Sequence, residues 1–475
     1  MDTDIRQTRR NGGRKYSICN VMHSKFVNAL VNKSGLNTAV IFTVASRLVQ
    51  GAGGFLSIFF VVRFLNKIEQ GYFYTFGSIL ALQVFFELGL TSIITQFTAH
   101  EFAKLNFKSQ ERLEGDPVSL SRISSLLHLS VKWFSVLSLC LFVVLSLFGY
   151  IFFSHYGKDP INWFYPWIIL VFTSSVNLLL TPILSFLEGL GKVKEIALIR
   201  LVQYTLQACL VLSLLSLNFH LFSSPIANFL SLLVIPIFIF FSYRKNVLIN
   251  IWKNIGSERV NYKKEILPFQ WKISLSWISG YFIYQLFNPV VFATEGAIVA
   301  GQMGLSLAIF NGIQSISLSW LNTKIPSFSV LIANEEYSKL DRIFRNTVLQ
   351  STVVSFLGVL VFLFFLYISS LYNFDFSKRF LSFTLLSLLG FSIIVNQFVA
   401  GLAIYLRCHK KEPFLYFSIV IAILIGVGIF LFGRFFGIWG IILWYSFVIV
   451  GLSLPWAIFI FLKKRREWHY NHPTY

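Results

Sequence analysis

The sequence predicts an all-α polytopic membrane protein. Of its 475 residues, 56% are hydrophobic and 13% are charged, and the mean hydropathy is +0.69. Soluble proteins have roughly a quarter charged residues, and about 20 consecutive apolar residues suffice to cross a bilayer as a helix. The charges lie in short clusters between apolar runs of that length. These observations argue against a soluble enzyme or a disordered chain, and the net charge of +20 does not indicate a nucleic-acid partner in so apolar a protein.

Twelve membrane-spanning helices are expected, in two halves of six. Two boundaries, Asn218–His220 and Gly433–Gly437, decide the count, because fusing either pair of helices would change its parity. The expected spans are 38–62, 71–97, 131–154, 162–187, 195–217, 221–243, 268–293, 297–320, 347–370, 380–405, 413–433 and 436–462.

The distribution of basic residues predicts the orientation. With a cytoplasmic N-terminus, 31 of the 40 Lys and Arg fall in cytoplasmic segments, six fall in outer loops, and Arg47, Arg200 and Lys272 fall inside spans. Cytoplasmic loops of membrane proteins are enriched in Lys and Arg. We therefore expect a multi-pass protein with both termini in the cytoplasm.

The same pattern predicts the domain boundaries. A basic tail, 1–36, lacks the apolar region and cleavage site of a signal peptide. The remaining segments are the first six-helix bundle at 37–243, a cytoplasmic linker at 244–266, the second bundle at 267–462 and a basic tail at 463–475. The four cysteines are scattered, so neither a disulfide nor a metal site is expected, and Asp2-Thr3-Asp4 is attributed to chance.

An internal repeat relates the two halves. Ala99–Leu105 and Ala333–Leu340 share Ala, Glu, Lys and Leu, and Gly71 and Gly301 each follow a short outer loop. Halves with an even number of spans enter the membrane from the same side, and such transporters bind substrate between the halves. Both repeated segments are interpreted as amphipathic interfacial helices or helix extensions on the cytoplasmic face, with solvated loops as the alternative.

Polar residues form a stripe along the first span, at Thr43, Ser46, Arg47, Gln50, Gly54 and Ser57. Arg47 lies ~13 Å into the span at 1.5 Å per residue. A charge at that depth costs at least ~2.5–3.5 kcal/mol unless it is paired or hydrated. Arg47 is therefore expected to face a watery cavity with an anionic ligand, or alternatively to pair with Glu87.

Glu87 is the carboxylate deepest inside a span. Burial raises a carboxyl pKa and a nearby cation lowers it, so Glu87 is the candidate for coupling to H⁺ or Na⁺. Other candidates are Arg200, Gln203 and Gln207 in the fifth span and Lys272 in the seventh, where snorkelling of the cations is the alternative. Asn311, Gln314 and Asn396 either line the cavity or join helices by hydrogen bonds.

Several stretches resemble one transporter family: Ala45–Gly51, Phe86–Leu90, Leu187–Val193 and Lys324-Ile325-Pro326. In order, they are similar to the polysaccharide transporter (O-antigen flippase) family of the multidrug/oligosaccharidyl-lipid/polysaccharide exporter superfamily. The resemblance extends over about 40–460, and Glu87 stands where the family often has Asp. It implies two six-helix bundles around a V-shaped central cavity, the MATE-like fold.

The resemblance also implies a function. The expected activity is flipping of a polyprenyl-diphosphate-linked oligosaccharide, such as an O-antigen unit for lipopolysaccharide, to the outer leaflet of the bacterial inner membrane. Cationic cavity residues would bind the diphosphate, either antiport of H⁺ or Na⁺ or the membrane potential would drive transport, and no cofactor is needed. Membrane lipids, a polysaccharide polymerase and a chain-length regulator are the expected partners.

Three alternatives remain from the sequence. A multidrug exporter of the same superfamily usually carries cations, which Arg47, Arg200 and Lys272 would repel. A lipid II flippase resembles the chain less and usually has two further helices. A membrane polymerase or acyltransferase would need outward acid and base residues, and the outer loops are short. The chain is therefore expected not to be an enzyme, and it has no P-loop for ATP.

Overall fold

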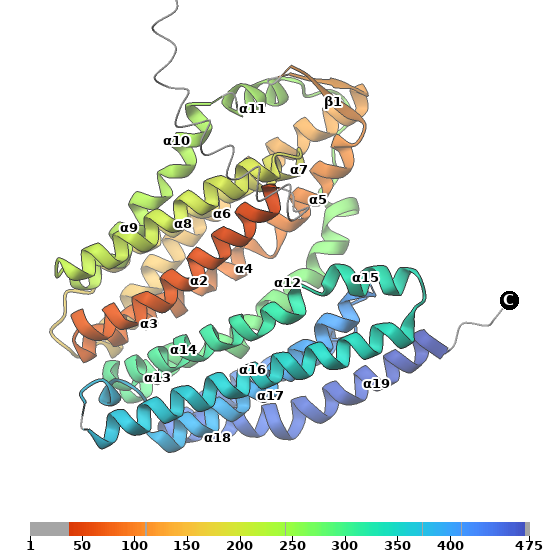
Figure 1. The fold of residues 1–475 in the computed structure, drawn as a ribbon. Coiled ribbons are helices and arrows are strands. Elements are labelled where there is room, and N and C mark those ends of the chain that lie inside the picture. The colour runs from red at the N-terminus through yellow and green to blue at the C-terminus, as the bar shows by residue number, and fades with distance from the viewer. Residues whose placement is uncertain (1–37, 110–111, 243, 373, 410, 471–475) are drawn as a thin grey trace, which may run out of the picture.

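The computed structural model describes residues 38–109, 112–242, 244–372, 374–409 and 411–470. These residues form two helical lobes that meet at one end and diverge at the other (Figure 1). At the closed end, α3 (Lys67–Leu80) lies against α13 (Phe287–Glu295) and α14 (Ala297–Asn322). At the open end, the hairpin Leu105–Gly115 of the first lobe is separated from α15 (Ile325–Ala333) of the second.

In the first lobe, α3 begins at a well-formed cap. At the start of α3, the Asn66 side chain accepts the backbone N–H of Glu69 at 2.8 Å, and the Glu69 carboxylate accepts that of Asn66 at 2.9 Å. This reciprocal box satisfies donors that a helix start leaves free. The other helices are α2 (Thr38–Phe64), α4 (Val84–Glu87), α5 (Leu90–Phe102), α6 (Pro117–Tyr156), α7 (Phe164–Gly189), α8 (Val193–Ser216), α9 (Ser223–Leu232) and α10 (Val234–Phe240).

A connector joins the lobes at the open end. It contains α11 (Arg244–Lys253) and a π-helical turn, Tyr262–Ile266, that runs directly into α12. Besides α13, α14 and α15, the second lobe contains α12 (Leu267–Tyr284), α16 (Tyr337–Leu371), α17 (Phe383–Cys408), α18 (Leu415–Phe447) and α19 (Leu454–Tyr470).

The helices account for the expected spans. Nine helices among the described residues are long and apolar enough to cross a membrane, or ten when the bent pair Lys67–Glu87 and Leu90–Phe102 counts as one span. One of the nine, Leu415–His469, is interrupted at Gly437, where φ is 56° and ψ is −146°, so it supplies two crossings. With α12 and α13 as the remaining span, the prediction of an all-α polytopic membrane protein is confirmed.

One expectation about local structure holds only in part: the first repeat segment does extend α5 as far as Phe102, but no separate helix follows. The segment after α5 does not form an interfacial helix but an antiparallel hairpin, β1 (Leu105–Ser109) with β2 (Arg112–Gly115). Its apolar side chains recur every second residue, which is the period of a strand, and Leu105 and Leu113 are buried. The second copy of the repeat does follow a helix, α15.

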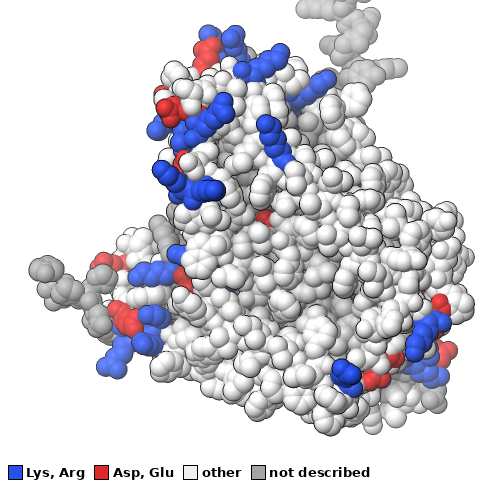
Figure 2. Space-filling view, turned by 180° about the vertical axis from the view of Figure 1, so that it is seen from behind, with Lys and Arg blue, Asp and Glu red and all other residues white. Residues whose placement is uncertain are grey.

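Charged side chains occupy both ends of the molecule. Figure 2 shows most Lys, Arg, Asp and Glu side chains in groups at the two ends, with a wide and almost uncharged surface between them. Large apolar side chains such as Leu139, Ile151 and Val361 are about two-thirds exposed on their helices. Such a surface is stable in lipid and not in water, so the protein is a multi-pass membrane protein. The tail 1–36, with Asp2 and Cys19, lies outside the described residues.

Candidate functional site: the interface between the lobes

At the closed end, α3 and α14 cross at very short distance because glycines stand at the crossing. A Cβ on Gly71 would overlap the carbonyl oxygen of Ala297, and a Cβ on Gly301 would lie 2.8 Å from the backbone nitrogen of Gly71. The Gln70 side-chain amide donates to the carbonyl oxygens of Gly301 at 2.8 Å and Arg379 at 3.2 Å. Both amide protons of a buried residue of the first lobe thus bond to the second.

An aromatic cluster extends this contact. Phe292 of the second lobe packs on Tyr72 and Phe153 of the first, with ring centroids 5.0 Å and 5.5 Å apart. Nearby, the Asn288 amide donates to the Ser78 hydroxyl at 3.2 Å. Buried aromatic contacts of this kind exclude water, so the closed end is sealed.

Between the closed and open ends, α12 maintains contact with the first lobe. The Ser274 hydroxyl donates to the carbonyl oxygen of Leu88 at 3.0 Å, and Ile273 packs so closely on Gly89 that a side chain there would overlap it. This contact lies at a break in the second span. The structure is therefore closed at one end and separated at the other, with α12 passing between the lobes (Figure 1).

Part of the polar face of α2 is open, although Ser46 is buried. α2 packs on α8 through Gly53, which contacts Ala208, and it reaches α14 of the second lobe. Arg47 and Gln50 are exposed, and a Cβ on Gly51 would meet nothing within 4 Å. In the part of the chain that the structure describes, Arg47 forms no ion pair, so the alternative pairing with Glu87 is not formed in this structure.

Glu87 lies at a break that divides the second span. Leu88 and Gly89 adopt left-handed conformations, with φ of 49° and 68°, and the two half-helices differ in direction by 42°. The Thr91 hydroxyl donates to the Glu87 carboxylate at 2.5 Å. The end of a helix leaves carbonyl oxygens free and carries partial negative charge. Glu87 forms no ion pair with another described residue, and its role in ion coupling stays a prediction.

The fifth span makes contacts within the first lobe. The Arg200 guanidinium lies 3.5 Å from the Glu188 carboxylate, and the Gln207 amide donates to the Asn228 side chain of α9. Gln203, between them, is half-buried and makes no side-chain hydrogen bond to another described residue. Arg200 and Gln207 are thus engaged in this structure, whereas Gln203 remains free to contact a ligand.

The remaining predicted residues are likewise either accessible to a ligand or engaged in contacts within the protein. Lys272 is exposed, with its ammonium 5.8 Å from the Trp271 ring centre, and Asn311 is exposed on α14. Gln314 is half-buried. Asn396 is buried and donates to the Tyr284 hydroxyl at 3.1 Å, joining α17 to α12. Asn396 therefore acts as an interhelical hydrogen-bonding residue here.

The structure adds residues that sequence reasoning did not select. Gln70 and Arg379 join the lobes although they are 309 positions apart. The matching positions of Gly71 and Gly301 in the two halves were a signal for the close crossing of α3 and α14. Equivalent residues of two related halves can meet where they lie near the axis that relates the halves. The ligand role of the open residues Arg47, Gln50, Lys272 and Asn311 stays a prediction.

Comparison with known proteins places this geometry in context. No protein-family model matches the chain. An uncharacterised membrane protein of Methanocaldococcus jannaschii is 26% identical over 299 residues, which are 60% of this chain and 63% of that protein. The chain therefore matches less than two thirds of the length of this relative.

Solved structures match over most of the chain. The lipid II flippase MurJ in an inward closed conformation has a TM-score of 0.62 at 10% identity, covering 90% of each chain. An inward-facing MATE-family multidrug resistance transporter has a TM-score of 0.56 at 14% identity, covering 89% of this chain and 98% of that one. The chain has the fold of MOP-superfamily transporters.

A third match belongs to the same superfamily. A transporter from Pyrococcus furiosus, whose binding pocket is described as having reverse polarity, has a TM-score of 0.53 at 16% identity and covers 91% of this chain and 95% of that one. All three neighbours are transporters or flippases with this fold, and none of them is described as an enzyme. The predicted MATE-like fold is confirmed.

Proposed function

We propose that this protein is a flippase that moves a polyprenyl-diphosphate-linked oligosaccharide from the cytoplasmic to the outer leaflet of the bacterial inner membrane. Arg47 carries the proposal: its guanidinium is exposed deep within the first span, beside glycines that leave open space. Guanidinium binds phosphate through two parallel hydrogen bonds. A deep cation without a protein partner is best explained by an anionic ligand.

The lipid-linked substrate also fits the divided architecture. Its glycan needs a hydrated space between the lobes, while its polyprenyl tail can remain in lipid. The positive-inside rule assigns the open end to the cytoplasm, so substrate would enter there. Outward movement of negative charge is favoured by ~2.3 kcal/mol per charge per 100 mV in an inside-negative cell. Glu87 at the helix break is the proposed site of H⁺ or Na⁺ coupling.

The rival function is multidrug export, which would use the same fold and the same proposed ion coupling. The exposed cations Arg47 and Lys272 argue against it, because they would repel cationic drugs. The Pyrococcus furiosus neighbour, whose pocket polarity suggests a different function, supports the view that pocket charge distinguishes members of this fold. A polysaccharide polymerase and a chain-length regulator would use the flipped product.

Substitution of Arg47 tests the proposal. We expect Arg47→Ala to abolish glycan export while the protein remains in the membrane, because the diphosphate loses its bidentate partner. Arg47→Lys should retain part of the activity, since lysine keeps the charge but not the fork. Export is measured as oligosaccharide that becomes accessible at the outer surface of cells or proteoliposomes.

Arg63→Ala is the matched control, because Arg63 lies at the closed end of the same helix and should be dispensable. Full export by a stably inserted Arg47→Ala protein would remove the role assigned to this cation. Export of a cationic drug by the wild-type protein without glycan export, unchanged or increased in Arg47→Ala, would instead support the rival function.

A further inference from the structure

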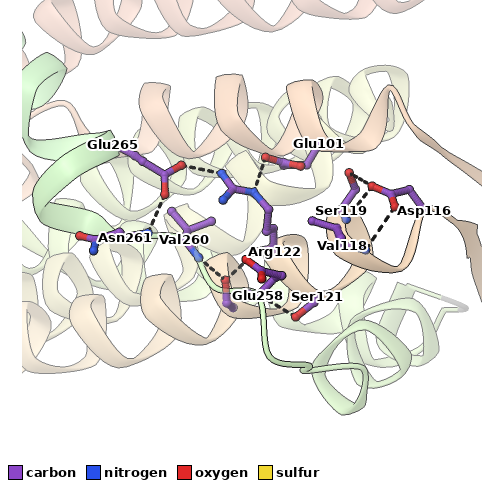
Figure 3. Close-up of polar contacts among 11 residues, drawn as sticks. Glu101, Asp116, Val118, Ser119, Ser121, Arg122, Glu258, Val260, Asn261 and Glu265 are labelled. Atoms are coloured by element: carbon purple, nitrogen blue, oxygen red, sulfur yellow. Dashed lines mark hydrogen bonds and ion pairs between the residues drawn. The ribbon is translucent and has the colours of Figure 1, made fainter.

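The connector between the lobes is held against the start of α6 by a row of serines. The Ser121 hydroxyl donates to the carbonyl oxygen of Glu258 at 2.6 Å and accepts the backbone N–H of Gly256 at 2.9 Å. The Ser125 hydroxyl accepts the N–H of Val260 at 3.0 Å (Figure 3). These bonds tie residues 256–260 to the first lobe, although the connector leads to the second.

Arg122 completes this attachment. Its Nε lies 2.8 Å from the Glu101 carboxylate at the end of α5, and its Nη2 lies 2.5 Å from the Glu265 carboxylate in the connector. Figure 3 shows the guanidinium between the two carboxylates. The other oxygen of Glu265 accepts the backbone N–H of Asn261 at 2.8 Å. One arginine thus joins two elements of the first lobe to the connector.

The environment makes this ionic contact persistent. The Arg122 side chain is 22% exposed and that of Glu101 is 8% exposed. The hydrogen bond from Arg122 holds the pKa of Glu265 below its usual value. A lowered carboxyl pKa means that the contact contributes above the ordinary pKa of glutamate and is lost only as the pH falls through the lowered value. Glu265 therefore stays charged across the physiological range.

The contact between the connector and the first lobe ends at Glu265, just before α12 begins. Glu265 belongs to the π-helical turn Tyr262–Ile266, and α12 follows at Leu267 with Pro268 in its first turn. π-helical turns are rare and often mark functional sites. Beyond this turn, α12 carries Lys272, bonds through Ser274 to Leu88 of the first lobe, and packs on α18 of the second lobe.

We propose that Arg122 is a positioning residue for transport: by fastening Glu265 to the first lobe, it fixes the π-helical turn as the pivot on which α12 and the second lobe move. The proposal rests on the alternating access of the proposed function. Arg122 contacts no substrate. It acts through Glu265 on the placement of α12, and hence of Lys272.

Two neutralising substitutions separate this role from ordinary stabilisation of the first lobe. Glu265→Gln removes the charge from the connector contact and retains an oxygen for the N–H of Asn261. Glu101→Gln is the matched control, because it weakens the other contact of the same arginine, entirely within the first lobe. We expect Glu265→Gln to lower export at least about tenfold and Glu101→Gln to change it less than about twofold, because only the first substitution releases the connector from Arg122.

A distance measurement provides a readout that needs no substrate. Spin labels at Lys132 on α6 and Lys263 in the turn, both exposed, are attached to Cys substitutions in a protein whose four native cysteines are replaced by Ser. Wild type and Glu101→Gln should give one narrow distance distribution, and Glu265→Gln a broad one. The distances are measured on purified protein in lipid nanodiscs.

The outcomes are distinguishable. Equal narrow distributions in all three proteins would overturn the pivot, as would equal loss of export and equal broadening in Glu101→Gln and Glu265→Gln. Failure of the wild-type protein to export glycan would contradict the proposed function, while the distance distributions would still decide whether Arg122 holds the connector.

Discussion

Glu87 is a carboxylate at a break in an otherwise apolar membrane span. Its carboxylate follows the last turn of α4, accepts the Thr91 hydroxyl, and has no cationic partner among the described residues. Both the helix end and the carboxylate are negative. Binding of Na⁺ or H⁺ would neutralise this charge and reduce the cost of placing it within the membrane.

We predict that Glu87→Gln weakens ion-coupled transport. The amide keeps an oxygen for the Thr91 hydroxyl, so the local structure should persist while the titratable charge is lost. Thr91→Val is the companion variant, because it removes the hydrogen bond and leaves the carboxylate. Export is measured in proteoliposomes under imposed pH and sodium gradients. If Glu87→Gln retains the wild-type dependence on both ions, Glu87 is a structural residue.

At the residue scale, sequence periodicity determines which side chains share a helix face but not which neighbour that face meets. Arg47 and Gln50 lie together on α2 and are exposed, as their spacing indicates. Arg200 and Gln207 also share a face, yet they bond to Glu188 and Asn228 of their own lobe. Those partners depend on how α7 and α9 pack, and the spacing along α8 carries no information about that packing.

At the scale of elements, the sequence predicts the helices themselves but not every break within them. An apolar window predicts a span and does not resolve the left-handed pair Leu88-Gly89 inside it. The break at Gly437 coincides with a boundary that the sequence does indicate, since Gly433 and Gly437 separate two apolar runs. The hairpin Leu105–Gly115 was missed because a loop between membrane spans has no burial pattern long enough to distinguish a strand from a helix.

The close crossing of α3 and α14 yields a prediction at this scale. Gly71→Ala places a methyl group on the carbonyl oxygen of Ala297 and should destabilise the protein by ~1–3 kcal/mol. Gly77→Ala is the control on the same helix, because a Cβ there meets nothing within 4 Å. It should be neutral or stabilising by up to ~1 kcal/mol. Thermal unfolding of the purified variants measures both, and equal midpoints would show that the crossing tolerates side chains.

At the scale of the whole molecule, the sequence predicts the two halves and their membrane character, and the structure supplies their relative position. The internal repeat and the clusters of charge are patterns of neighbouring residues, so they can be recognised in a single sequence. Closure of one end of the molecule depends on contacts such as Gln70 to Gly301, which join residues 231 positions apart. These contacts form only when the lobes meet, and a transporter must also break them.

Separation of the closed end is therefore required for export, and a cross-link there should stop it. Lys67 and Lys378 lie on opposite lobes, and both act electrostatically on the carboxylate of Asp375. We predict that joining Cys substitutions at these two positions with a reducible bismaleimide lowers export at least tenfold, because α3 can no longer leave α14. Reduction of the linker should restore export.

Cross-linking Lys67→Cys to His220→Cys is the control, since His220 lies 3.2 Å from Glu69 within the first lobe and this linker leaves the lobes free to separate. Unchanged export by the protein cross-linked between lobes would contradict alternating access through this end.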